Sequence, residues 1–298
     1  MPKRSPIAPP PVKLRSRPRP PAWALPAVLA GLLATSVLLA TGKNSRPPTQ
    51  PSPPASTPNV QTSPVDGMAL IFIPAGPFPM GSDQGDPDEK PVHIVTLSDY
   101  WIDQTEVTNA MYARCVQAGV CQPPRKTASA TRSDYYDNTL YANYPMLQVK
   151  WEMASRYCAW ARRRLPSEAE WEKAARGPDG RTYPWGEAAP DATRLNFNNL
   201  LGDTAPVASY PLTGASPYAI HDLAGNAWEW VNDYYDPNYY QASPASNPPG
   251  PTQGSTRILR GGSWNNYGYY VRAASRSAAA PDDLDGTGYG FRCASTQP

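Results

Sequence analysis

One segment of the chain, Asp222-Leu-Ala-Gly-Asn-Ala-Trp-Glu229, carries oxygen donors at a spacing that suits a hard cation. Calcium takes about six to eight oxygens from carboxylates, amides and backbone carbonyls. Asp222 and Glu229 would supply carboxylates, and the carbonyls of Gly225 and Ala227 would add neutral donors. We therefore expect a structural Ca²⁺ ion in this loop. The alternative is that Asp222 caps a turn and Glu229 pairs with an arginine.

The cysteines form a second group with chemistry of its own: Cys115, Cys121, Cys158 and Cys293. No two of them have the CxxC spacing, so neither a thioredoxin-like centre nor a zinc ribbon is indicated. Outside the cytoplasm four cysteines should pair. A local bridge between Cys115 and Cys121 is sterically feasible, which leaves Cys158 for Cys293. Reduced thiols, either buried or reactive, are the alternative.

The elements that position these residues begin with helices. Ser167 is followed by Glu170 at the spacing of a capping box, and Gly177 ends the helix that they start. Two further helices are expected over 105–119, with Thr105 or Thr108 as N-cap and Gly119 as the stop, and over 149–164.

Apolar runs predict the strands, and helical periodicity disappears after residue 177. Metal ions and disulfides are the expected supports of that second half, because long irregular stretches are uncommon in compact domains. Its arginines are expected to pair with internal carboxylates: Arg272, Arg276 and Arg292. The strands are expected at 68–74, 93–102, 206–210, 228–231, 257–259, 271–274 and 290–294.

The first 65 residues differ from the rest in composition. Residues 1–21 are a basic, Pro-rich tail that we expect to be disordered and cytoplasmic. Residues 22–42 form an uncharged apolar segment long enough to cross a bilayer, and the basic flank orients it. The alternative is a cleaved signal peptide, which would make the protein secreted. Residues 43–65 are a Pro-rich linker, and 66–298 form the domain.

The charges of the domain exclude one class of function. Of the 27 basic and 25 acidic residues, eight basic and no acidic ones lie in the first 65 positions, which leaves 19 basic against 25 acidic in 66–298. A net charge of −6 argues against nucleic acid as a partner. The Tyr and Trp content of this part excludes disorder.

Seven motifs in order resemble the formylglycine-generating enzyme, or sulfatase-modifying factor, family. The resemblance spans 66–296 and implies an α+β domain with little regular secondary structure, a variant of the C-type lectin fold that calcium often stabilises. The motifs are Gly76-Pro-Phe-Pro-Met-Gly-Ser82, Thr105-Glu-Val-Thr-Asn109, Arg164-Leu-Pro-Ser-Glu-Ala-Glu-Trp-Glu172, Tyr183-Pro-Trp-Gly186, Gly225-Asn-Ala-Trp-Glu-Trp230, Arg260-Gly-Gly-Ser-Trp264 and Gly290-Phe-Arg-Cys293.

The resemblance also implies sites. It places a second calcium at Asn196, Phe197 and Asp203, and it supports the pairing of Cys158 with Cys293. The family's active groove would be lined here by aromatic and amide side chains that suit a peptide or a sugar, unless the tryptophans are core and the tyrosines ordinary surface. These candidates are Trp228, Ser263, Trp264, Asn265, Asn266, Tyr267, Tyr269 and Tyr270.

The family's enzyme oxidises a substrate cysteine with O₂ and copper, which two cysteines after the Gly-Gly-Ser segment hold. Here Asn266 stands at the first of those positions and Tyr269 or Tyr270 at the second. Copper is therefore not expected, since neither amide nor phenol replaces a thiolate pair. A related branch of the family binds iron through histidines. That chemistry is not expected here either, because the chain has only His93 and His221.

These observations lead to one functional expectation and one rival. We expect an exported, membrane-tethered accessory module that binds a peptide, a glycan or a protein partner and has no catalytic residues of the family's kind. The rival is an oxidoreductase of the formylglycine-generating type that uses a different metal centre.

Overall fold

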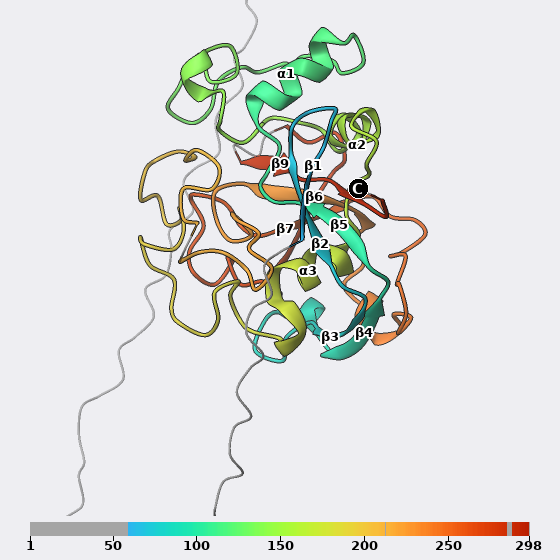
Figure 1. Ribbon diagram of the computed structural model, residues 1–298. Helices are drawn as coiled ribbons and strands as arrows, with labels where there is room; N and C mark the ends of the chain where they lie inside the picture. Colours follow the sequence, from blue (N-terminus) through green and yellow to red (C-terminus); the bar gives the residue numbers. More distant parts are fainter. Residues whose placement is uncertain (1–58, 212, 285–287, 298) are drawn as a thin grey trace, which may run out of the picture. The chain divides into compact units, whose positions relative to one another are not determined.

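The computed structural model describes residues 59–211, 213–284 and 288–297, all of which belong to one compact unit of the chain (Figure 1). The apolar segment 22–42 and the basic tail lie outside the described residues. Within the described part, every helix is too short or too polar to cross a bilayer.

The first sheet joins the two ends of the domain. It contains β1 (Val60–Thr62), β2 (Ala69–Ile73), β5 (Tyr100–Asp103) and β10 (Ala294–Ser295) in that order, with antiparallel pairing throughout. The sequence assigned 60–65 to the linker. That boundary is wrong, because β1 pairs with β2 and the domain therefore starts before residue 66.

A two-stranded hairpin of β3 (Gly76–Met80) and β4 (His93–Leu97) lies at the opposite end of the domain from α1 (Figure 1). The sequence predicted one strand over 93–102. Instead the chain breaks at Ser98-Asp99, and β4 and β5 enter different sheets. The reason is visible in burial: β4 is covered on one face, whereas β5 is buried on both.

The third sheet underlies the candidate site and has the order β8-β7-β6-β9, with β6 and β9 parallel. The expected strand at 206–210 is a turn, and so is 271–274, although Val271 and Ala273 are buried. Segment 271–274 was predicted as a strand because most of its residues are apolar; they are buried, but their backbone does not pair with any described strand. The strands are β6 (Trp228–Tyr234), β7 (Arg257–Arg260), β8 (Arg276–Ala279) and β9 (Tyr289–Phe291).

The helices start where the capping residues predict. Thr108 caps α1 (Asn109–Gln117) through the Met111 N–H, and Ser167 caps α3 (Glu168–Arg176) in a full capping box. Helix α2 (Trp151–Trp160) is shorter than expected at both ends. Short 3₁₀ turns complete the structure: η1 (Pro87–Glu89), η2 (Thr139–Tyr141), η3 (Gly177–Asp179) and η4 (Tyr239–Gln241).

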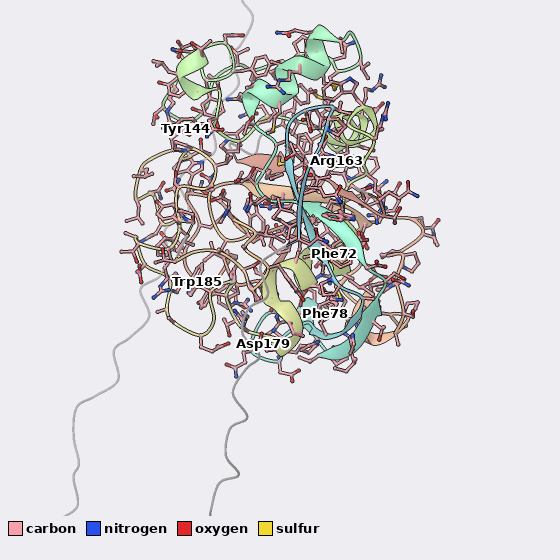
Figure 2. The ribbon with its side chains drawn as sticks, in the orientation of Figure 1. Phe72, Phe78, Tyr144, Arg163, Asp179 and Trp185 are labelled. Atoms are coloured by element: carbon pink, nitrogen blue, oxygen red, sulfur yellow. A yellow bond between two sulfur atoms is a disulfide. The ribbon has the colours of Figure 1, made fainter. Side chains whose placement is uncertain are left out.

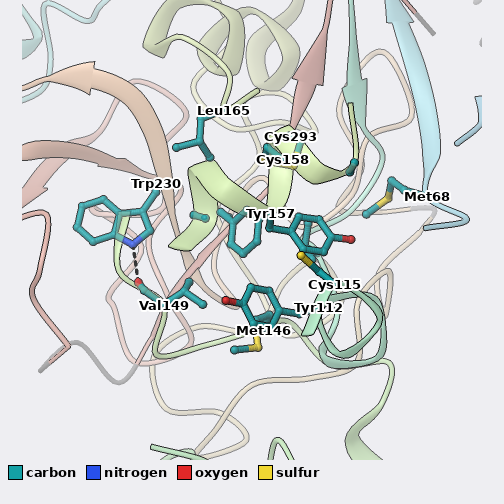
Figure 3. Close-up of a cluster of buried hydrophobic side chains, with 14 of the residues drawn as sticks. Met68, Tyr112, Cys115, Met146, Val149, Tyr157, Cys158, Leu165, Trp230 and Cys293 are labelled. Atoms are coloured by element: carbon teal, nitrogen blue, oxygen red, sulfur yellow. Dashed lines mark hydrogen bonds between the residues drawn. A yellow bond between two sulfur atoms is a disulfide. The ribbon is translucent and has the colours of Figure 1, made fainter. Parts of the chain in front are cut away.

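Both expected disulfides are present. Cys115–Cys121 closes the end of α1, and Cys158–Cys293 joins α2 to the segment before β10. The second bridge lies in an aromatic core in which Tyr157 packs against Phe291 (Figure 3). In the same core the Trp230 indole N–H donates to the carbonyl of Val149 at 2.9 Å.

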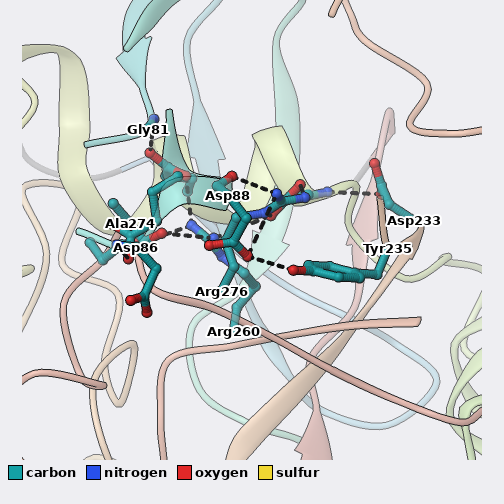
Figure 4. Close-up of polar contacts among 12 residues, drawn as sticks. Gly81, Asp86, Asp88, Asp233, Tyr235, Arg260, Ala274 and Arg276 are labelled. Atoms are coloured by element: carbon teal, nitrogen blue, oxygen red, sulfur yellow. Dashed lines mark hydrogen bonds and ion pairs between the residues drawn. The ribbon is translucent and has the colours of Figure 1, made fainter. Parts of the chain in front are cut away.

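Buried ion pairs hold the irregular second half of the domain together. From the sequence we expected metal ions and disulfides to be its main supports. Arg260 donates to Glu172 at 2.6 Å and to Glu168 at 3.2 Å, and Arg276 donates to Glu168 at 2.7 Å (Figure 4). Arg272 forms a bidentate pair with Glu89. The predicted pairing of Arg272, Arg276 and Arg292 with internal carboxylates is confirmed.

Candidate functional site

The carboxylate of Glu229 points into the protein from β6. Its oxygens accept from Arg292 Nε and Nη2, each at 2.7 Å, and from the Trp171 indole N–H at 2.8 Å. The pair is wholly buried. The structure therefore shows the alternative that the sequence left open, in which Glu229 pairs with an arginine, and both carboxylate oxygens are in use.

Asp222 lies beside a second buried carboxyl that sequence reasoning missed. Asp222 accepts from the Ala208 N–H at 2.6 Å, and its carboxyl lies close enough to Glu106 for their charges to interact. Glu106 Oε1 accepts from the Asn226 amide at 2.9 Å, and Glu106 Oε2 is buried without a partner among the described residues. Glu106 belongs to the Thr105–Asn109 motif, but nothing in its spacing indicated a role.

Three carboxyl groups thus lie near the Arg292 cation: Glu106 and Glu229 are buried, and Asp222 is partly exposed. Burial, followed by the charges of Asp222 and Glu229, raises the pKa of Glu106 well above its usual value. Burial also raises the pKa of Asp222. Because Arg292 already pairs with Glu229, the other two carboxyls need a proton or a further cation to balance their charge. Glu106 Oε2, which has no partner among the described residues, is an oxygen of the kind that a hard cation binds, although the three carboxyls do not together form a metal-ligand group.

The two expected calcium loops touch each other. Gly225 has a φ of 73°, and a Cβ at this position would lie 2.3 Å from the backbone oxygen of Asn196. That oxygen accepts from the Asn226 N–H at 2.9 Å. Ala227 is buried against Tyr135. Glycine is needed here because the loops approach each other so closely.

The carboxylate of Asp203 holds a distant segment in place. Asp203 Oδ2 accepts from the Ser129 hydroxyl at 2.6 Å and from the N–H and hydroxyl of Thr131, each at 2.9 Å, and Arg132 lies 3.3 Å away. Burial opposes ionisation, yet these bonds hold the pKa of Asp203 below its usual value. Asp203 therefore secures the long excursion over 122–147, on which Tyr144 lies (Figure 2).

Asn196 and Phe197, the other two expected ligands of the second calcium, also form hydrogen bonds within the protein. Asn196 Nδ2 donates to the Asp203 carbonyl at 2.8 Å, while Asn196 Oδ1 is buried without a described partner. The Phe197 carbonyl accepts from the Leu200 N–H at 3.0 Å within a turn. In the described part of the chain, His, Cys, Asp and Glu form no group of three or more that could hold a metal ion.

The loop over 263–270 divides into a buried and an exposed part. Ser263 and Trp264 are buried, and the Trp264 indole N–H has no partner among the described residues. Asn266 Oδ1 accepts from both the N–H and the hydroxyl of Ser263 at 2.8 Å, so this amide closes a tight turn. Trp228 is also buried and belongs to the core. Asn265 and the tyrosines face outward.

The exposed part continues into a neighbouring loop. The Asn198 and Asn199 N–H groups donate to the carbonyls of Asn266 and Trp264, so the two loops lie side by side. Tyr267 is 66% exposed and Leu201 57%. We call the outward-facing apolar residues of the two loops the tyrosine surface: Leu200, Leu201, Tyr267, Tyr269 and Tyr270.

Comparison with known proteins identifies the family. The sulfatase-modifying factor enzyme 1-like domain matches residues 56–297. The chain belongs to this family. Its fold is the formylglycine-generating-enzyme type of mixed helix and strand, as the resemblance predicted. The structure of PvdO from Pseudomonas aeruginosa superposes on it with a TM-score of 0.67, at 26% identity, over 82% of this chain and 99% of PvdO.

Two curated relatives show how differently this family domain is used. The chain is 35% identical to the formylglycine-generating enzyme of Streptomyces coelicolor, over 82% of this chain and 95% of that enzyme. It is 37% identical to the serine/threonine-protein kinase pkn1 of Chlamydia caviae, of which it spans only 37%. The chain thus spans a little over a third of that kinase, so membership of the family does not by itself fix an activity.

Proposed function

We propose that this family member is a binding module whose recognition site is the tyrosine surface, and that its partner is a peptide segment of another protein. The observation that carries the proposal is the exposure of Tyr267, Tyr269 and Tyr270 on one ordered loop. Monomeric domains rarely expose a contiguous apolar patch without a use for it.

The chemistry of the loop supports a protein partner. Its sequence, Ser-Trp-Asn-Asn-Tyr-Gly-Tyr-Tyr, has the composition of antibody recognition loops, in which Tyr supplies rigid contact area and Asn supplies adaptable hydrogen bonds. The turn that Asn266 closes and the bonds to Asn198 and Asn199 hold the loop in one conformation. Such order lowers the entropic cost of binding.

The rival function, oxidation of a cysteine, needs a metal centre other than the family's copper site, whose expected position is in this loop. The residue at the first expected copper position, Asn266, uses its side-chain oxygen to bond Ser263. The loop has no cysteine, and neither an amide nor a phenol replaces a thiolate for copper. These facts favour binding over turnover.

One experiment separates the two functions. The purified protein is screened against an array of short peptides and, separately, assayed with copper, O₂ and a cysteine-containing peptide. We expect saturable peptide binding that a Tyr267→Ser/Tyr270→Ser variant loses and that Ile94→Ser, an exposed apolar control on the β3–β4 hairpin, retains. Cysteine oxidation would disprove the binding-module proposal, and binding of glycans alone would correct the partner class.

We also propose that the domain is held outside the cytoplasm by residues 22–42. The support is the length of this apolar segment and the basic flank before it. Protein in cells should resist extraction from membranes at high salt, and external protease should release the domain. A soluble mature protein with a new N-terminus near residue 41 would show a cleaved signal instead.

Calcium is the cofactor that we propose for the domain. Because Glu229 is saturated by Arg292 and Trp171, we assign the charged ligands to Asp222 and to Glu106, whose Oε2 is unpartnered. Bound calcium would neutralise the excess negative charge of this buried group and so fix the loop that precedes β6.

A further inference from the structure

A hollow of about 190 Å³ lies at the N-terminal end of α2, and no role has been assigned to it so far. Its apolar lining residues are Pro123, Met153 and Leu284. Its polar lining residues are Gln122, Arg125, Gln148 and Lys150. The hollow therefore offers both charge and apolar contact to a small ligand.

Gln148 is the first sign that the hollow is a binding site. Its side chain lines the hollow, the residue is only 7% exposed, and its Oε1 is buried without a partner among the described residues. Its backbone has a φ of 60°, which is the left-handed region that side chains other than Gly and Asn seldom adopt. A buried amide oxygen without a described partner, on a residue with positive φ, costs stability, so a function is the natural reason for it.

The start of α2 is the second sign. This ten-residue helix has Lys150 as its N-cap, and Lys150 makes no side-chain capping bond. A lysine side chain has no acceptor atom, so it cannot satisfy the free N–H groups of the first turn as Ser or Asp would. The Trp151 N–H is bonded to the Pro281 carbonyl at 3.0 Å. The remaining first-turn N–H groups give this end of the helix a partial positive charge.

The charged residues that line the hollow in the described part of the chain are both cations. Arg125 and Lys150 line it, and neither forms an ion pair with another described residue. Among the described residues that line the hollow, none is Asp or Glu. The nearest carboxylate of α2, Glu152, lines the adjoining hollow and pairs with Arg156 at 3.2 Å.

We propose that this hollow binds an oxyanion, a carboxylate or a phosphate group, whose short carbon chain lies against the apolar lining residues. Arg125 and Lys150 pair with the anion, and the helix N-terminus adds backbone donors. The Gln148 carboxamide, turned so that Nε2 faces the ligand, donates a further hydrogen bond. The site is separate from the tyrosine surface, and the inference does not rest on the proposed function.

The test measures binding of inorganic phosphate and of glutarate to the full-length protein by calorimetry at low ionic strength. An Arg125→Met/Lys150→Met variant should bind at least about tenfold more weakly, whereas Arg156→Met/Arg162→Met, with the same loss of charge on exposed residues, should change affinity by less than about twofold. Saturable binding of phosphate, of glutarate or of both supports the site, and the pattern identifies the source of the anion.

A second variant separates binding from folding. Gln148→Gly relieves the positive φ and removes the unpaired amide, so its melting temperature should not fall, while anion affinity should drop. Unchanged affinity in Gln148→Gly would overturn the role of the amide. Absence of saturable binding to wild-type protein, or equal weakening by the control pair, would overturn the site.

Discussion

Arg292 and Glu229 form a bidentate ion pair with no exposure to solvent, and this pair connects the chain after β9 to β6 at the centre of the third sheet. Arg292 also donates to the carbonyls of Asp103 and His221, at 3.0 Å and 2.9 Å. One side chain thus ties together segments from the beginning, middle and end of the domain.

Substitution of Arg292 by Met should lower the free energy of unfolding by about 3–5 kcal/mol, because it leaves the Glu229 carboxylate buried without its partner. Urea denaturation measures the loss. Arg156→Met serves as the control: it breaks an exposed pair with Glu152 and should cost less than about 1 kcal/mol. Similar losses in both variants would contradict the importance of burial.

Removal of calcium should destabilise the domain. A ligand that binds only the folded state contributes about 2.7 kcal/mol at a hundredfold excess over its dissociation constant, so a chelator should lower the melting temperature by about 5–10 °C. Asp222→Asn should abolish this response, and Asp99→Asn, an exposed control, should retain it. Identical melting with chelator and with Ca²⁺ would refute the calcium proposal.

The two disulfides should contribute unequally. Cys158–Cys293 spans 135 residues and Cys115–Cys121 only six, and a long loop restricts the unfolded chain more. Replacement of both Cys158 and Cys293 by Ser should cost about 2–5 kcal/mol, and replacement of Cys115 and Cys121 clearly less. Denaturation of the two double variants under non-reducing conditions compares them directly. The reverse order would exclude this entropic explanation.

The raised pKa of Asp103 should make the free energy of unfolding fall as the pH rises. It shares Arg163 with Asp66, and burial, only partly offset by Arg163, raises the pKa of Asp103 to about 7. The folded protein then holds a proton that the unfolded chain releases near pH 4, so this contribution is complete below about pH 4 and is lost as the pH rises through 7.

Asp103→Asn mimics the protonated acid and should flatten the dependence. Unfolding free energies between pH 4 and 8 test this when wild type and variant are compared at each pH. If wild-type stability rises relative to the variant over this range, the carboxyl is ionised in the folded state and the expected sign is wrong.

How much of the fold could be read from the sequence depends on the range of the interaction. The capping box at Ser167 and Glu170 placed α3 correctly because both partners lie within three residues. The break at Ser98-Asp99 was missed because it depends on which sheet each strand joins. Turn 271–274 was mistaken for a strand because its residues are buried without being paired.

The same limit applies to the candidate site. Glu229 is bonded by Arg292, and Asp203 by Ser129 and Thr131, across more than 60 residues of chain. No local pattern reveals such partners. A carboxylate that pairs with a buried arginine, or that accepts hydrogen bonds from hydroxyls, therefore looks like a metal ligand in the sequence. Gln148 likewise stands out only once its backbone angle and its missing partner are known.

The short strand β1 determines how the domain responds to mechanical force. All three of its residues are exposed, and among the described strands it pairs with β2 alone. Among the described elements, β1 is the first that tension from the N-terminal side would reach, and no side chain of β1 is part of the hydrophobic core. Cys158–Cys293 joins α2 covalently to the end of the chain, so we expect this part of the domain to stay closed while β1 separates.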